Sequence, residues 1–198
     1  DGSTEGRIGF DNSYLYYTGA GAGLMMRASD IIPTNGGGTP TDNTEDLGDA
    51  LFRFDDIFAT NNTIQTSDQN EKQQIASLTD AEITAAKAIS KLFKTFKWND
   101  SVAENGDAAR THTGVIAQQV ETAMSDAGLD ASKYAFWCSD TWWEADGELY
   151  ETLEEAPEGA TERNRKGIRY AELLSFIGAA TEQRLTSIEA RLNALENA

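Results

Sequence analysis

The chain changes character at Thr66-Ser67-Asp68-Gln69-Asn70-Glu71-Lys72-Gln73-Gln74-Ile75. Before this stretch, short apolar runs are separated by glycine, asparagine and aspartate, which is typical of β-strands joined by turns. After it, apolar residues recur at helical spacing, and the chain ends in a heptad-like pattern. We therefore predict an α+β fold that divides here, with a β-rich part over residues 1–67 and a mixed α/β part over residues 68–198.

Composition and charge exclude several classes of protein. The 198 residues, 39% of them hydrophobic, suffice for one domain with a substantial core or for two small units. The net charge is −17 and neither part holds a basic patch, so we expect no nucleic-acid partner. No apolar run reaches the ~18 residues of a membrane-spanning helix, so we expect no membrane insertion.

The sequence offers no sign of a redox centre, a cofactor or a metal, and we expect none of them. Cys138 is the only cysteine, which rules out an internal disulfide. We interpret it as a small buried residue rather than a catalytic thiol. The glycine-rich segment 19–27 lacks the lysine and the serine or threonine that a phosphate-binding loop requires.

The first part carries little apolar sequence for its length. Segments 6–10 and 13–17 flank Asp11-Asn12 and predict a hairpin. Alternating glycine over residues 19–27 suits close backbone approach in intertwined or stacked strands. The remaining segments are an expected loop over 33–49 and a strand-like return over 51–59. We expect this part to bury its apolar side against copies of itself, as fibrous trimers do.

The second part begins its regular structure at Thr79, which forms a capping-box pattern with Glu82. Apolar residues then follow at helical spacing, namely Ile83, Ala86, Ile89, Phe93 and Phe96. Residues 95–98 turn strand-like, 113–117 predict a buried strand, and a helix follows that stops near Gly128.

An aromatic region and a long helix complete the second part. Residues 134–150 predict a hairpin around Asp146-Gly147, rich in tryptophan that serves either core packing or stacking on a sugar. A helix over 171–198 carries one a/d seam, whose strong members are Leu174, Leu185, Ile188, Leu192 and Leu195. This spacing predicts a coiled coil, and the alternative is an amphipathic helix packed on its own domain.

Ser67 is the candidate nucleophile, and a serine hydroxyl needs a base at neutral pH. His112 is the only histidine and lies in a polar run, so a Ser-His-Asp hydrolase has little support. Lys72 can act as the base only if it loses its proton, which burial favours. Positions five apart meet only if the chain turns, and Asp68-Gln69-Asn70 is suitable turn material. The alternative is a solvated polar loop.

These residues resemble the C-terminal intramolecular chaperone of bacteriophage tail fibres and tailspikes, as found in endosialidase-type tailspikes. Each matching segment is modest alone, but their order and spacing are specific, and the match covers about residues 50–198. The segments are 54–61 with 64–68, Lys72 with Ile75 behind it, 113–120, and 167–174 leading into the last helix.

The resemblance implies a homotrimer in which residues 68–198 guide the folding of the fibre that precedes them. It also implies self-cleavage between Ser67 and Asp68, with Ser67 as the catalytic serine and Lys72 as its activating partner. Residues 1–67 would then be the end of a mature fibre in the virion tail, in contact with the host cell surface. The released chaperone would remain in the host cytoplasm.

Two other readings of the same residues stay open at this stage. One is a trimeric fibre tip that binds a cell-surface glycan through its tryptophans and does not cut itself. The other is a structural trimer whose coiled coil only holds the chains together. All three predict several copies of the chain, and only the first predicts processing at Ser67.

Overall fold

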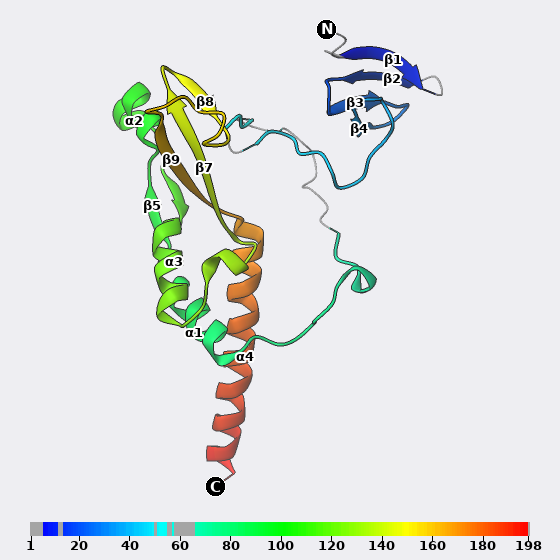
Figure 1. Cartoon of the computed structure of the whole chain (residues 1–198). Coiled ribbons are helices and arrows are strands. Elements are labelled where there is room, and N and C mark those ends of the chain that lie inside the picture. Colours follow the sequence, from blue (N-terminus) through cyan, green and yellow to red (C-terminus); the bar gives the residue numbers. More distant parts are fainter. Residues whose placement is uncertain (1–5, 12–13, 50, 55–56, 58–65, 198) are drawn as a thin grey trace. The chain divides into compact units, whose positions relative to one another are not determined.

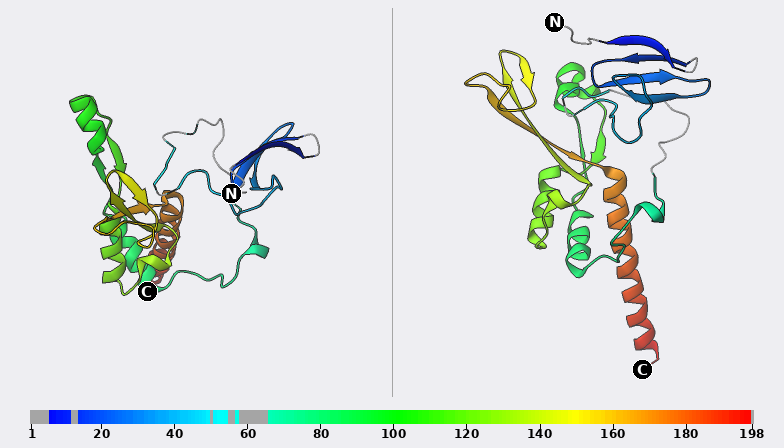
Figure 2. Two further views of the ribbon diagram at one scale, coloured as in Figure 1. Left: turned by 45° about the horizontal axis from the view of Figure 1, so that its top comes forward. Right: turned by 45° about the vertical axis from the view of Figure 1, so that its right-hand side comes forward.

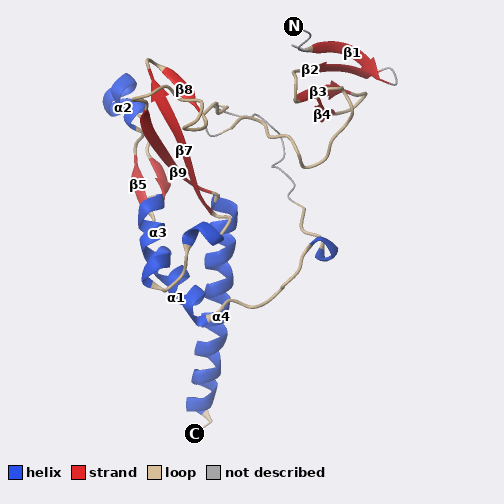
Figure 3. Ribbon diagram, in the orientation of Figure 1, coloured by secondary structure: helices blue, strands red, loops and turns tan. Residues whose placement is uncertain are grey.

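The computed structural model describes residues 6–11, 14–49, 51–54, 57 and 66–197. The chain forms two compact units, Asp1–Asn61 and Asn62–Ala198. It contains both helices and sheets, as the predicted α+β class requires (Figure 3). Within the described ranges, none of the helices combines the length and the apolar character needed to cross a bilayer.

The first unit is a four-stranded antiparallel sheet in which neighbouring strands are also consecutive in sequence (Figure 1). Its strands are β1 (Arg7–Asp11), β2 (Tyr14–Thr18), β3 (Ala22–Met26) and β4 (Ile31–Asn35). The predicted first hairpin is confirmed, because Ile8 pairs with Tyr17 and Phe10 pairs with Leu15.

Two strand predictions for the first unit need correction. The loop expected from residue 33 is wrong at its start, since β4 continues to Asn35 and Pro33 pairs with Leu24. A proline is tolerated there because β4 is an edge strand and needs no donor on its open side. In the expected strand 51–59, residues 51–54 and 57 are not in a strand, and the others lie outside the described residues.

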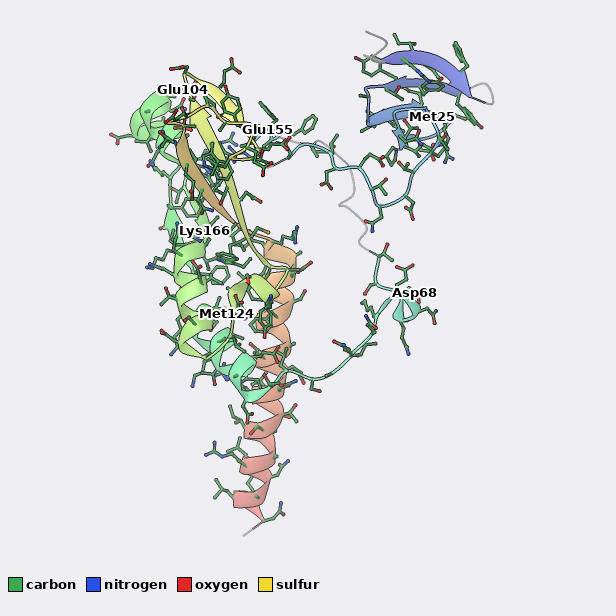
Figure 4. The ribbon with its side chains drawn as sticks, viewed as in Figure 1. Met25, Asp68, Glu104, Met124, Glu155 and Lys166 are labelled. Carbon is green, nitrogen blue, oxygen red and sulfur yellow. The ribbon has the colours of Figure 1, made fainter. Side chains whose placement is uncertain are left out.

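The two faces of this sheet differ sharply. On one face Met25, Thr18 and Thr34 are fully buried, and the Thr18 hydroxyl donates to the carbonyl of Gly36 at 3.1 Å. Gly36 can approach so closely because it has no side chain: a Cβ there would lie 2.1 Å from the Ala20 carbonyl oxygen. Met25 is labelled in Figure 4.

The opposite face is apolar and exposed, and we call it the apolar sheet face. Strand pairing places its residues together, because cross-strand partners in a sheet point to the same side. Its large exposed members are Ile8, Phe10, Leu15, Tyr17, Leu24, Met26 and Ile31. Ile8 and Phe10 remain 75% and 74% exposed in the single chain.

The second unit is built on three packed helices, α1 (Asp80–Ile89), α3 (Ala117–Asp126) and α4 (Tyr170–Glu196). Helix α1 packs against both α3 and α4. The right-hand view of Figure 2 shows α4 running beside α1 and then extending beyond it. The buried core comprises Ala85, Ala86, Ile89, Val115, Val120, Ala123, Met124, Ala131, Phe136, Leu173, Phe176 and Ala180.

Two small sheets complete the second unit. The larger has the order β8-β7-β9, with β7 (Trp137–Ala145), β8 (Glu148–Tyr150) and β9 (Thr161–Ile168). The other pairs β5 (Lys94–Phe96) with β6 (His112–Gly114), and α2 (Asn99–Asn105) lies between them in sequence. Short 3-10 turns are η1 (Gln69–Glu71), η2 (Gly106–Ala108) and η3 (Ala131–Lys133).

Several predictions for the second unit are confirmed in kind and corrected in extent. Helix α1 ends at Ile89, so Phe93 and Phe96 are not helical; Phe96 lies in β5. The strand expected over 113–117 stops at Gly114, where a Cβ would lie 2.1 Å from the Tyr170 hydroxyl oxygen. The hairpin around Asp146-Gly147 is confirmed, with positive φ of 53° and 85° at the two turn residues.

Helix α4 has one buried and one exposed apolar side. Leu173, Phe176 and Ala180 are buried in the core. The predicted seam residues Leu174, Leu185, Ile188, Leu192 and Leu195 are instead exposed, and Leu195 reaches 75%. The alternative of a helix packed on its own domain therefore describes the first side of α4 but leaves the seam without a partner among the described residues.

The capping box at Thr79 is present and has an additional donor from another part of the fold. The Glu82 carboxylate accepts from the Thr79 backbone N–H at 2.7 Å and from the Tyr134 hydroxyl at 2.9 Å. The backbone bond from Thr79 is the main cause that lowers the pKa of Glu82. Burial, followed by the bond to Glu82, raises the pKa of Tyr134 to about 12. The start of α1 is thus tied to the segment before β7.

We predict that Glu82→Ala lowers the free energy of unfolding by about 1–2 kcal/mol near pH 7, because it removes the cap and its bond to Tyr134. The folded pKa of Glu82 is lowered, so its contribution is present above the usual pKa of 4.5 and is lost as the pH falls below it. Urea unfolding at several pH values measures this, with Glu189→Ala as an exposed control. A deficit that stays constant down to pH ~3 contradicts the assignment.

Candidate functional site

The chain turns sharply at the junction between the two predicted parts. Asp68 caps η1, and its Oδ1 accepts from the Asn70 backbone N–H at 2.8 Å and from the Asn70 side-chain Nδ2 at 2.9 Å. The Lys72 backbone N–H donates to the carbonyl of Gln69 at 3.2 Å. Figure 4 labels Asp68 on this turn. The turn that a Ser67–Lys72 contact requires is therefore formed.

The contact itself is made across this turn. The Lys72 Nζ donates a hydrogen bond to the Ser67 Oγ at 2.6 Å. Among the described residues, no carboxylate forms an ion pair with Lys72. The neighbouring Glu71 therefore does not bind the amine directly. The structure brings the two predicted site residues together, and their catalytic roles remain predictions.

The site is open to water in the single chain. All side chains from residue 66 to residue 77 are exposed. A lysine that acts as a base must be neutral, and removal from water is what favours the neutral amine. The described residues of this chain do not enclose Lys72, so they do not supply such burial.

His112 occupies a different place in the second unit. Its ring stacks on Phe96 with a centroid distance of 5.7 Å, and Trp98 lies 6.2 Å away. In the described part of the chain, the ring contacts of His112 are with Phe96 and Trp98, and Ser67 is not a contact of His112. The arrangement offers no Ser-His pair.

In the tryptophan-rich strand β7, a cation lies over one face of the Trp137 ring and of the Trp142 ring. Lys166 lies 4.6 Å from the Trp137 ring centroid, and Arg165 lies 4.9 Å from that of Trp142. The Trp137 indole N–H also donates to the Ala117 carbonyl at 3.2 Å. Stacking on a sugar needs an open ring face. In these two tryptophans one face instead contacts a cation of β9, which helps to hold β7 and β9 together.

Cys138 differs from its expected place. It is only partly buried, and its thiol makes a long 4.0 Å contact with the Ala135 carbonyl. It lies on the β7–β9 ribbon, which is covered less completely than the helical core. In the described residues, no group of three or more His, Cys, Asp or Glu side chains is placed to hold a metal ion.

Residues 67–129 match the model of a peptidase family described as the chaperone of endosialidase. Over these residues the chain belongs to the endosialidase-chaperone family. The matched range begins at Ser67, contains Lys72, and continues through α1, α2 and α3. It therefore covers the candidate site together with α1 and α3 of the three packed helices.

The relatives of this chain are phage tail proteins. It is 34% identical to the probable tail spike protein of Klebsiella phage 0507-KN2-1, over 92% of this chain and 17% of that protein. It is 32% identical to the side tail fiber protein pb1 of Escherichia phage T5, over 76% of this chain and 11% of that protein. The chain thus spans less than a fifth of either relative.

A solved structure extends the similarity to the fold. It is the carboxy-terminal domain of the bacteriophage T5 L-shaped tail fiber with its intra-molecular chaperone domain. The match has a TM-score of 0.64 at 27% identity and covers 96% of this chain and 50% of that one. The similarity to a tail-fibre domain solved with its intra-molecular chaperone domain thus extends over almost the whole of this chain.

One element of the site was not predicted from the sequence. The Asp68 side chain and the Asn70 amide form the turn, whereas the sequence analysis used residues 68–70 only as turn-forming types. The available signal was the Asp-x-Asn spacing, since an aspartate side chain often accepts from the backbone two residues on.

We predict that Lys166→Ala destabilises the β7–β9 ribbon by about 0.5–1.5 kcal/mol, because it removes the cation from Trp137 and an ion pair with Glu121. Unfolding followed by tryptophan fluorescence measures the loss, and Lys133→Ala, an exposed lysine, is the matched control. Equal stability of the two variants contradicts a role for Lys166 in the ribbon. Figure 4 labels Lys166.

Proposed function

We propose that residues 68–198 drive the trimerisation and folding of the fibre before them and then separate by cutting the Ser67–Asp68 bond. The observation that carries this proposal is the 2.6 Å contact between the Lys72 amine and the Ser67 hydroxyl. It lies at the first residues of the family match and at the junction of the two predicted parts. The enzyme would turn over once, on its own chain, with no external substrate.

Two exposed apolar surfaces support assembly into several copies. The apolar sheet face in the first unit and the α4 seam in the second are both exposed in the single chain. Burial of apolar area is worth roughly 25 cal/mol per Å², so each surface favours association. The seam spacing from Leu185 to Leu195 suits a coiled coil, and three chains would place three seams about one axis.

The proposed cleavage breaks the bond between the Ser67 carbonyl carbon and the Asp68 nitrogen. Direct attack by the Ser67 hydroxyl on its own carbonyl needs a strained four-membered ring. A water activated with help from Ser67 and Lys72, or a group from a neighbouring copy, is the easier route. The nucleophile adds to the carbonyl carbon, and the Asp68 nitrogen leaves as an amine after it gains a proton.

In this proposal, assembly promotes cleavage because it removes water from the Lys72 amine. In the single chain the Lys72 amine is exposed. Packing of neighbouring copies around the turn would remove water from the amine and favour its neutral form. Cutting then follows correct assembly. Loss of the chaperone makes the assembled fibre hard to unfold and refold, which is a kinetic form of stability.

Location follows from the same proposal. The part up to Ser67 would stay in the virion tail, where the mature fibre contacts the host cell surface. The part from Asp68 would be released in the host cytoplasm. A glycan-binding tip without self-cleavage has less support, because the Trp137 and Trp142 ring faces contact cations.

We predict that the wild-type chain yields a fragment that begins at Asp68, whereas Ser67→Ala stays whole. Lys72→Met should slow cutting by about 10²–10⁴-fold, which is the usual contribution of a general base. Denaturing gels and intact mass measure this, with Lys91→Met, an exposed lysine of the same unit, as control. Equal cutting of wild type and Ser67→Ala removes the proposed protease.

We predict that Ile188→Asp in the Ser67→Ala background weakens association, because it places a charge in the α4 seam. The expected result is a loss of the trimer at protein concentrations where the parent is fully assembled. Sedimentation analysis over a concentration series measures it, and Ser187→Asp, one position off the seam, is the control. A trimer of unchanged stability would argue against the seam as an interface.

A further inference from the structure

We infer that Asp68 and Asn70 are positioning residues for self-cleavage, and that Asp68 acts through the reach of its side-chain oxygen rather than through its charge. The inference rests on the proposed function, since it concerns the same bond. Neither side chain is given a role in attack or proton transfer. Their role is to hold the turn that brings the Lys72 amine to the Ser67 hydroxyl.

The first step of the argument is the geometry of the turn. A single oxygen, Asp68 Oδ1, accepts two hydrogen bonds from Asn70, at 2.8 Å from the backbone nitrogen and 2.9 Å from Nδ2. Asp68 itself is extended, with φ −68° and ψ 137°, and the chain enters η1 directly after it. These bonds therefore act where the extended chain begins to turn.

The second step is that little else holds this turn. Its side chains are exposed, so packing does not fix it in the single chain. The backbone bonds from Glu71 to Asp68 and from Lys72 to Gln69 are 3.3 Å and 3.2 Å, longer than the two Asp68 bonds. The fraction of chains in which Lys72 can reach Ser67 then depends on the side-chain cap.

The third step separates reach from charge. The Asp68 carboxylate is directed to Asn70, and among the described residues it forms no ion pair with Lys72. An asparagine at this position keeps the chain length and the acceptor oxygen but loses the charge. A glutamate keeps the charge but lengthens the side chain by one methylene. The two substitutions therefore test opposite properties of one residue.

The experiment refolds the full chain and follows the appearance of the Asp68 fragment with time, by gel and intact mass, from pH ~6 to ~10. We expect Asp68→Asn to cut within about twofold of wild type. We expect Asp68→Glu and Asp68→Ala to be slower by about 2- to 30-fold, the range that corresponds to the loss of a helix cap. Asn70→Ala should cut more slowly than Asp68→Asn and faster than Asp68→Ala, since its backbone N–H still donates.

Further readouts distinguish positioning from general damage to the fold. The midpoint of the pH profile should be the same in wild type and Asp68→Asn, because the charge of Asp68 is not used. In the uncut Ser67→Ala background, hydrogen exchange at the Asn70 amide should be faster in Asp68→Glu than in Asp68→Asn. The oligomeric state and helix content of these variants should match their parent.

The outcomes that overturn the inference are specific. If Asp68→Glu cuts like wild type while Asp68→Asn is slow, charge is the property that matters. If every variant cuts like wild type, the cap does not position the site. If wild type itself stays whole, the proposed cleavage is lost and this inference falls with it, which is a different result from the first two.

Discussion

Helix α4 buries only one of its two apolar sides within the chain, and much of the second unit follows from that constraint. Leu173, Phe176 and Ala180 pack into the core with α1, so the first half of the helix holds the fold together. The seam from Leu185 to Leu195 lies beyond this packing and stays exposed. A buried apolar side and an exposed apolar seam thus coexist in one helix.

The candidate site shows the same incompleteness on a smaller scale. A local turn is enough to place the Lys72 amine 2.6 Å from the Ser67 hydroxyl. It is not enough to remove water from that amine, since every side chain around it is exposed. Among the described residues, the turn thus supplies the alignment of the two groups but not their desolvation.

Local signals predicted some elements well and others poorly. The Thr79–Glu82 box marked the start of α1, and Asp146-Gly147 marked a hairpin, because both depend on residues close in sequence. Strand β9 was not predicted because Thr161–Ile168 is mostly polar. It pairs with β7, and much of it faces water. Helix α2 was missed because its N-cap, Trp98, makes no side-chain cap bond.

By itself, the sequence determined the capped start of α1, the final helix and the turn at Asp68, all of which arise from neighbours a few residues apart. Only the tertiary structure decided which side of α4 enters the core and which face of the first sheet is left open. It also showed that a cation lies over the ring of Trp137 and over that of Trp142. These outcomes depend on contacts between segments far apart in sequence, and apolar or aromatic spacing is the same whether the partner lies in the chain or outside it.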